Sequence, residues 1–314
     1  MSNIIEMPKV GISGKVLSWE VINDDGSIDQ SCYKPSDNLV LNSGISIFCN
    51  ANWGAINQDP WSFFSIGTGT SEPSATDTAL TSKSYAGTCE YTAYNSTTYS
   101  TDGSDPYYIY TQRGVQTPLG ALNGTYGEIG FSRTSTGQLF SKHRLKDELG
   151  NPTTITVTST QQLRLKYVVV LCLSPSTVTT GTINISGIGN INYEAKWQST
   201  SFNYIVRLFN MIDANIRMSS VHSDFTFTNI GSSPPQPSSA NNTSFTRQYV
   251  SDTPGSADIY NTSFWSVDVA NNTWYGIVSP NPTNRCFMVK FETPFVKANT
   301  HTMHFTIKYT IGRS

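Results

Sequence analysis

The chain has 314 residues, a net charge of −2 and only 13% charged residues, against about 25% in a typical globular protein. Because Lys and Arg form no cluster, the chain lacks the basic footprint of a nucleic-acid-binding protein. Its 12% aromatic residues argue against a disordered chain. The longest apolar run, residues 167–173, is too short to cross a bilayer, and the first residues have no signal-peptide pattern.

The chain begins with a hairpin pattern. Residues 14–23 and 27–30 are predicted strands around Asp25-Gly26, a pair that supplies the positive φ angles of a tight turn. Residues 38–48 follow, and their apolar spacing fits either a strand or a short helix. The scarcity of Ala, Leu, Glu and Lys otherwise disfavours helices throughout the chain.

Further along, short segments predict strands. Residues 63–66 form one that ends at Gly67, and residues 167–173 form a buried one. Residues 153–158 and 305–311 alternate between apolar and polar positions, as expected of strands with one buried face. Because Gly, Pro, Asn and Ser separate these strands, we expect an all-β protein built from antiparallel, jelly-roll-like β-sandwiches.

The second half of the chain repeats positions of the first. Three blocks recur in order, with residues 61–74, 123–129 and 163–167 falling on 225–238, 271–277 and 305–309. This predicts a tandem duplication, with an N-terminal domain of residues 1–175, a boundary near residues 174–181 and a diverged copy at residues 176–314. The recurring apolar positions should be buried: Ile66, Ile129, Leu163, Leu165, Ile230, Ile277, Phe305 and Ile307.

No motif of the sequence predicts catalysis, a cofactor or a metal site. His301 and His304, three apart on a predicted strand, would face opposite sides. Gly67-Thr-Gly69 lacks the Lys-Ser/Thr ending of a phosphate loop, and Glu128 falls on Gly276 in the repeat, so duplication does not support a catalytic acid. The five cysteines have no CxxC spacing, which favours buried thiols over disulfides or zinc: Cys32, Cys49, Cys89, Cys172 and Cys286.

Two segments are candidate contact surfaces. Residues 91–110 hold the densest cluster of tyrosines, which we expect in loops, because tyrosine offers large contact area with little rotamer entropy to lose. An alternative is that half of them face inward as core residues. Residues 231–242 are expected to form an extended loop without strand pairing, because they are rich in proline. The candidate residues are Tyr91, Tyr94, Tyr99, Tyr107, Tyr108, Tyr110, Pro234, Pro235 and Pro237.

Residues 10–173 resemble a group of tailed-bacteriophage virion proteins that are labelled tail, fibre or minor structural proteins. The resemblance rests on Asn38-Leu-Val-Leu-Asn-Ser-Gly44 and on the run from Ile66-Gly67-Thr-Gly69 to Asp77-Thr-Ala-Leu80. It continues, in order, through residues 127–131, 139–142, 146–157 and 163–167. The second copy lacks clear equivalents of Gly69, Asp77 and Leu80. The group implies a virion component and brings no catalytic residue.

The resemblance and the composition together predict a non-enzymatic structural protein of a phage particle, made in the host bacterial cytoplasm. We expect it in the tail, baseplate or fibre-attachment region, in contact with other virion proteins and with copies of itself. A trimer of duplicated subunits would match a sixfold ring. Two alternatives are a capsid decoration or head-fibre protein and a carbohydrate-binding receptor module that takes host surface glycan. No nucleic-acid or membrane partner is expected.

Overall fold

The computed structural model describes residues 4–50, 60–89, 96–99, 107–174, 176–187 and 189–197, and then shorter segments up to residues 304–314. The first part holds one helix, α1 (Asn42–Asn50), and strands β1 (Ile4–Glu6), β2 (Val10–Asn23), β3 (Ile28–Cys32), β4 (Ser36–Val40), β5 (Phe63–Gly67), β6 (Lys83–Thr88), β7 (Ser96–Tyr99), β8 (Tyr107–Gln116), β9 (Gly124–Tyr126), β10 (Glu128–Ser132), β11 (Leu139–Arg144), β12 (Ile155–Val157), β13 (Gln161–Leu173), β14 (Val178–Ile185) and β15 (Gly189–Trp197). The later segments are β16 (Arg217–Ser219), β17 (Phe227–Asn229), β18 (Gln236–Ala240), β19 (Ser244–Val250), β20 (Trp265–Ser266), β21 (Tyr275–Val278), β22 (Arg285–Phe291), β23 (Val296–Lys297) and β24 (His304–Arg313).

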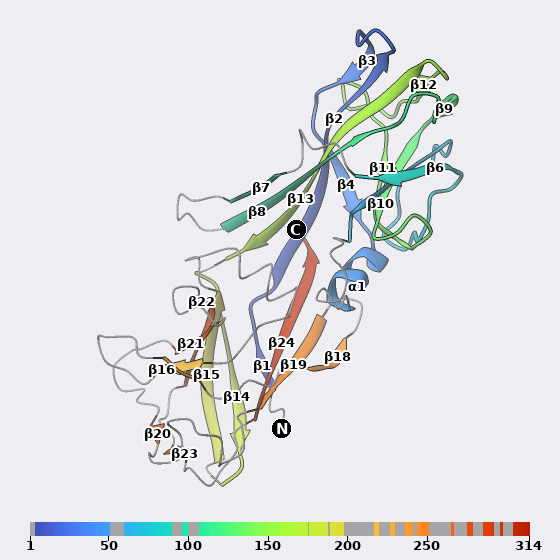
Figure 1. Ribbon diagram of the computed structural model, residues 1–314. Coiled ribbons are helices and arrows are strands. Elements are labelled where there is room, and N and C mark those ends of the chain that lie inside the picture. The colour runs from blue at the N-terminus through green and yellow to red at the C-terminus, as the bar shows by residue number, and fades with distance from the viewer. Residues whose placement is uncertain are drawn as a thin grey trace.

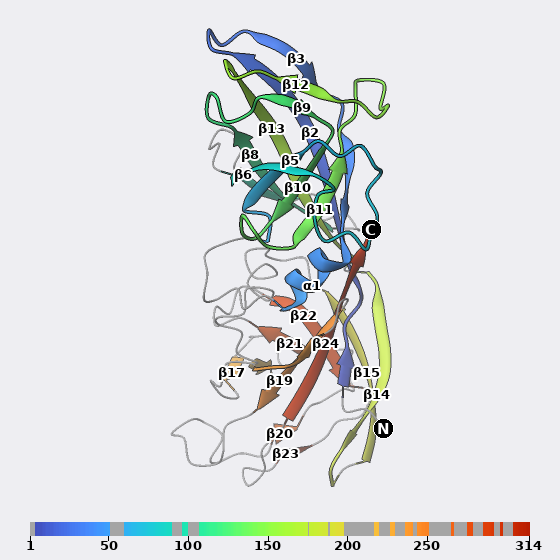
Figure 2. The same ribbon diagram turned by 90° about the vertical axis from the view of Figure 1, so that its right-hand side faces the viewer.

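The fold is all-β, as predicted. The largest sheet of the described residues runs in the order β18-β19-β24-β2-β4-β11-β10-β5-β6, and β13 adds to it by pairing with β2 and β8. Its pairs are antiparallel except those that β24 makes with β1 and β2. A smaller sheet has the order β14-β15-β22-β21. The ribbon is elongated, with β3, β9 and β12 at one end and the β14–β15 hairpin toward the other (Figures 1 and 2).

The predicted first hairpin is confirmed. β2 and β3 pair antiparallel, and Gly26 in the turn between them has a φ of 85°, a conformation that glycine adopts without steric cost. The turn is closed by the backbone N–H of Asn23, which donates to the carbonyl of Ser27 at 2.9 Å. Asp25 Oδ1 accepts from the backbone N–H of Ser27, also at 2.9 Å.

The ambiguous segment 38–48 contains both of the elements that its spacing allowed. Residues 38–40 are the last residues of β4, and α1 begins at Asn42. A side chain at Gly44 would collide with the backbone of Phe140 in β11, so this glycine lets the helix pack directly against the sheet. The expectation that helices are disfavoured throughout is therefore wrong at α1, where packing of the buried Ile45 outweighs weak helix propensity.

The core lies between β13 and the inner face of the β5–β10–β11 region. Phe64 and Phe131 are fully buried, as is Tyr167 of the predicted buried strand. The first four predicted core residues are confirmed, since Ile66, Ile129, Leu163 and Leu165 are at most 1% exposed. Ile230 lies outside the described residues, and the structure describes only the backbone of the other three: Ile277, Phe305 and Ile307.

The proline-rich segment differs from its prediction. Residues 236–240 form β18, which pairs antiparallel with β19, and Pro237 is in register with Arg247. The expectation of a loop without strand pairing is therefore wrong for these residues. Proline is tolerated here because β18 is an edge strand and its register shifts after Pro237, the two settings in which a missing N–H costs little.

Strands at repeated positions have different neighbours. β5 pairs with β6 and β10. The strand that corresponds to β5 is β17, which pairs with β16. The strand that corresponds to β6 is β19, which pairs with β18 and β24. β13 and β24 contain the repeated blocks 163–167 and 305–309. Both strands pair with β2, β13 antiparallel and β24 parallel. The tandem duplication stays a prediction from the sequence.

Candidate functional site

A buried ion network lies on the face of the β5–β10–β11 region that is turned away from the core. Lys142 Nζ on β11 lies 3.0 Å from Asp77 Oδ2 and 3.2 Å from Glu128 Oε2 on β10. Its third neighbour is Thr81 Oγ1, also at 3.2 Å. The side chains of Lys142 and Glu128 are 3% and 0% exposed, whereas that of Asp77 is 27% exposed. An ammonium group between two carboxylates is thus held almost entirely out of water.

Residues 68–82, which connect β5 to β6, cover this network. The backbone N–H of Ser82 donates to Glu128 Oε1 at 2.9 Å, and that of Ser74 donates to Asp77 Oδ2 at 3.1 Å. Gly69 lies against Glu128 so closely that a side chain there would collide with the carboxylate. The glycines of the Gly67-Thr-Gly69 motif therefore make room for the protein's own buried anion.

Both carboxyl groups of the network are held in their ionised form. Burial raises the pKa of Glu128, but hydrogen bonds from the backbone N–H groups of Ser82 and Thr81, together with Lys142, outweigh it and leave the pKa below its ordinary value. For Asp77 burial again raises the pKa, and the Ser74 N–H and Lys142 lower it further than burial raises it. Neutralising either carboxylate would leave Lys142 buried with less compensation, which is costly.

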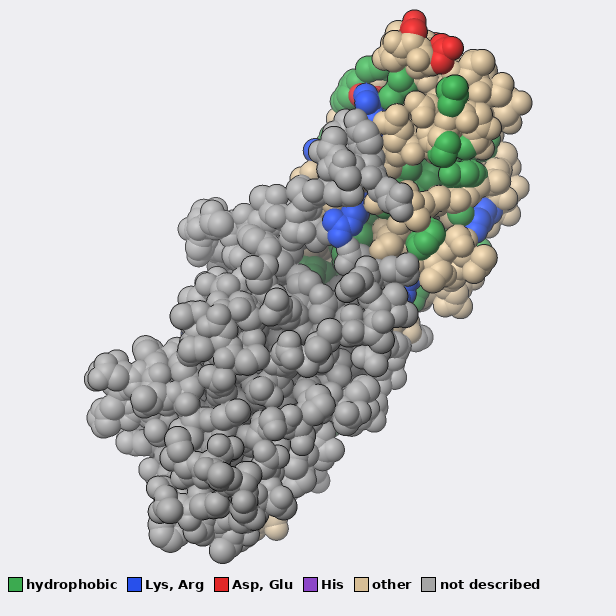
Figure 3. Space-filling view, viewed as in Figure 1, with side chains coloured by type: hydrophobic (Ala, Val, Ile, Leu, Met, Phe, Trp, Pro, Cys, Tyr) green, Lys and Arg blue, Asp and Glu red, His purple; other side chains and the backbone are tan. Residues whose placement is uncertain are grey.

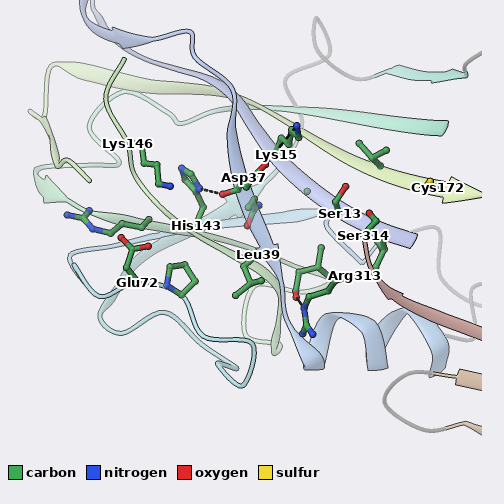
Figure 4. Close-up of a pocket in the computed structure, with 17 residues that line it drawn as sticks. Ser13, Lys15, Asp37, Leu39, Glu72, His143, Lys146, Cys172, Arg313 and Ser314 are labelled. Carbon is green, nitrogen blue, oxygen red and sulfur yellow. Dashed lines mark hydrogen bonds and ion pairs between the residues drawn. The ribbon is translucent and has the colours of Figure 1, made fainter. Parts of the chain in front are cut away.

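A groove of about 590 Å³ is lined by residues of β2, β4, β11, β13 and β24, by Glu72 and Pro73 of the 68–82 connection, and by Lys146 and Ser314. His143 lies in its wall between Lys146 and Asp37 (Figure 4). One ring nitrogen, Nδ1, is 2.8 Å from the Asp37 carbonyl, and Nε2 is 3.1 Å from Ser36 Oγ. Burial lowers the pKa of His143; the hydrogen bond to the Asp37 carbonyl raises it and the nearby charges of Lys146 and Arg144 lower it, which together leave it at about 4. His143 is therefore a neutral imidazole at pH 7.

Two arginines, Arg144 and Arg313, line the groove. Arg144 Nη1 donates to the carbonyls of Gly127 and Thr153. Arg313, near the end of β24, donates from Nε to the Val40 carbonyl and from Nη2 to Asn42 Oδ1 at 2.6 Å. Burial lowers the pKa of Arg313. The contacts of both guanidinium groups are thus with the protein's own backbone and side chains.

A capped turn between β11 and β12 presents an exposed leucine. Asp147 Oδ1 accepts from the backbone N–H groups of Leu149 and Asn151 at 2.9 and 2.8 Å, and Gly150 has a φ of 88°. The hydrogen bond from Asn151 holds the pKa of Asp147 below its ordinary value. Leu149 is 79% exposed, and its carbonyl accepts from Lys34 Nζ at 3.1 Å.

The tyrosines of the proposed contact surface do not all lie in loops. Tyr99 belongs to β7, whereas Tyr107, Tyr108 and Tyr110 belong to β8, which pairs with both β7 and β13. The loop prediction is wrong for these four, because residues 96–99 and 107–116 form a hairpin arm of the sheet. Of the remaining candidates, Pro237 is in β18, whereas Tyr91, Tyr94, Pro234 and Pro235 lie outside the described residues.

Sequence reasoning missed the ion network. A signal for it exists in Gly127-Glu128-Ile129-Gly130, a carboxylate flanked by glycines within an otherwise apolar strand. Its partners are distant in the sequence, and the repeat gives no hint of them. Of the cysteines, Cys32 and Cys89 are buried and Cys172 is half-buried, lining the groove. Within the described ranges, no three His, Cys, Asp or Glu side chains gather closely enough to hold a metal ion.

Comparison with known proteins gives no relative from which a function could be carried over. No family model, curated protein or solved structure matches the chain. Among the described residues, no helix has the length and apolar character needed to cross a membrane.

Proposed function

We propose that this chain is a non-enzymatic structural component of a tailed-phage particle, placed in the tail, baseplate or fibre-attachment region and acting through protein–protein contacts. The proposal rests on the resemblance of residues 10–173 to virion proteins. The residues that carry this resemblance have structural tasks in the fold. Gly69 accommodates Glu128, Asp77 pairs with Lys142, and Leu80 is buried in a cluster with Leu41 and Leu139.

Two features support action by contact. At the end of the molecule that carries β3, β9 and β12, the surface is largely uncharged and has scattered apolar side chains (Figures 1 and 3). Such a surface suits a subunit packed among others. Leu149 lies on a turn that is held by hydrogen bonds to Asp147. Binding of a partner would therefore cost little conformational entropy for ordering this turn. Tyr33, 53% exposed, lies nearby, because its backbone N–H donates to Glu148 Oε1 at 2.5 Å.

The assembly and the finer fold are part of the same proposal. Two sandwich domains, residues 1–175 and 176–314, would arise by duplication, supported by the three ordered sequence blocks. A subunit with two related surfaces would form a symmetric oligomer in the particle, and a trimer would fit a sixfold tail. The protein would be made in the host cytoplasm and end in the virion.

Quantitative mass spectrometry of purified particles tests the proposal. We expect the chain at a fixed copy number relative to a tail-tube protein, in a multiple of three. A copy number in the hundreds that scales with the major capsid protein would favour a decoration protein instead. Specific retention on a glycan array would favour a receptor module. Absence from the particles, or turnover of a host glycan by the purified chain, would contradict the proposal.

A further inference from the structure

Lys142, Asp77 and Glu128 place an amine between two carboxyl groups inside the protein. Nζ makes ion pairs with Asp77 Oδ2 at 3.0 Å and with Glu128 Oε2 at 3.2 Å. Groups held together and out of water need neither an encounter nor the removal of a full hydration shell before they react. We propose that Lys142 and Asp77 condense to an intramolecular amide, an isopeptide bond, and that Glu128 carries the protons.

The surroundings of the amine favour this reaction. Lys142 is in register with Gly130 on β10 and with Leu39 on β4. The space above Gly130 is filled by Leu80 and Leu139, which belong with Leu41 and Leu39 to one apolar cluster. Bulk water is largely excluded from this side of the amine, so the proton transfer that produces the reactive amine and carboxylic acid takes place between groups already in contact.

The reaction balances without any further reagent. Starting from the ion pair, one proton moves from Lys142 Nζ to the Asp77 carboxylate through Glu128. The neutral amine then adds to Asp77 Cγ and forms the C–N bond. Glu128 accepts a second proton from the nitrogen and returns it to a hydroxyl oxygen on Cγ, whose C–O bond breaks as one water leaves. The amide keeps the third proton, and Glu128 ends as it began.

Asp77 fits the role of the acceptor better than Glu128. It belongs to the 68–82 connection, outside the paired strands of the sheet, and its side chain is 27% exposed, so the released water has a way out. Glu128 is fixed in a strand between β5 and β11 and is fully buried. Its Oε1 is held by the Ser82 N–H while Oε2 faces Lys142, a position suited to passing protons.

The bond would tie the β5–β6 connection covalently to β11. Unfolding of that connection would then leave residues 77 and 142 joined, which restricts the unfolded chain in the way that a disulfide does. Unlike a disulfide, an amide withstands a reducing cytosol. In a subunit that bears load in an assembly, such a link would slow unfolding and proteolysis of the covering loop.

Intact mass spectrometry of the denatured full-length chain tests the proposal. We expect the wild-type protein to be lighter than its sequence mass by one water, and a protease digest to contain a Lys142 peptide joined to an Asp77 peptide. Lys142→Arg, which keeps the positive charge, and Glu128→Gln, which keeps the shape, should both have the full sequence mass. Lys146→Arg is the matched control and should keep the loss of water.

Three outcomes would overturn the proposal. The first is a wild-type chain at full sequence mass after prolonged incubation in the folded state. The second is a loss of water that persists in Lys142→Arg, as cyclisation at Asp25-Gly26 would give. The third is a digest in which Lys142 is joined to Glu128. The first and third outcomes are read on the wild-type chain alone, so the proposal can be contradicted even if a variant does not fold.

Discussion

The ring of Tyr167 on β13 stacks on the ring of Phe131 on β10, with centroids 3.7 Å apart and planes inclined by 10°. Both side chains are fully buried. Because β13 pairs with β2 and β8 whereas β10 pairs with β5 and β11, this stack joins two strands that do not pair with each other in the described part of the chain. It is a central contact of the core.

We expect Phe131→Ala to lower the free energy of unfolding by about 3–5 kcal/mol, since it leaves a cavity under Tyr167. Tyr167→Phe removes only the hydroxyl, which lies 3.3 Å from Ser141 Oγ, and should cost about 0.5–1.5 kcal/mol. Urea denaturation measures both. Equal losses for the two variants would show that the stack does not organise the core.

Gly69→Ala should destabilise the protein by about 1–3 kcal/mol, because the added methyl group collides with the buried Glu128 carboxylate. Thr68→Ala, one residue away and exposed, is the control and should change stability by less than about 0.5 kcal/mol. Thermal unfolding of the two variants provides the comparison. If Gly69→Ala were as stable as the control, the glycine would have no part in seating Glu128.

Stability should fall at acidic pH because His143 becomes protonated on unfolding. Its pKa is about 4 in the folded protein, against an ordinary value of 6.5, so between these pH values the unfolded chain binds the extra proton. The contribution is complete above pH 6.5 and is lost as the pH falls to about 4, a loss of about 3 kcal/mol. In the His143→Gln variant, the urea midpoint should change less with pH in this window. An unchanged pH dependence would argue against a buried neutral imidazole.

In chains in which the Lys142–Asp77 amide has not formed, the carboxylates of the ion network act in a lower pH range. Because the folded pKa values of Asp77 and Glu128 lie below their ordinary values of 3.8 and 4.5, their stabilisation is present above those values and is lost as the pH falls through the folded ones. The His143→Gln variant should therefore keep this second, more acidic loss. If this acidic loss of stability disappears in the Glu128→Gln variant, it is assigned to the ion network.

Leu149→Asp should leave the free energy of unfolding within about 0.5 kcal/mol of the wild type, because the side chain is largely exposed. The same change should reduce incorporation of the chain into particles if the capped turn contacts a neighbour. Leu119→Asp is the matched control, since Leu119 is an exposed leucine, at 53%, on a different loop. Incorporation can be measured by quantitative mass spectrometry, and equal incorporation of both variants would remove Leu149 from the contact surface.

Sequence patterns predicted the elements whose determinants are local. The Asp25-Gly26 hairpin and the buried strand around Tyr167 depend on neighbours in the chain, and both are present; of the alternating strand predicted at residues 153–158, residues 155–157 form β12. The parallel pairing of β24 with β2 joins residues about 300 positions apart, and no local pattern indicates it.

The ion network escaped prediction for the same reason. Glu128 and Lys142 are brought together by the register of β10 and β11, and Asp77 reaches them only because the 68–82 connection folds back over the sheet. Pro237 shows the opposite case, in which a strong local rule was applied without knowing that its strand lies at a sheet edge.

The position of the chain in the particle tests the central claim most directly. A gold-binding tag could be placed after residue 186 in the β14–β15 turn, whose two flanking strands remain paired. Averaged electron micrographs of tagged particles should then show the label at the tail, baseplate or fibre-attachment region, in a symmetric arrangement. Label spread over the head, or tagged chain that is made in the cell and never found on particles, would contradict the account.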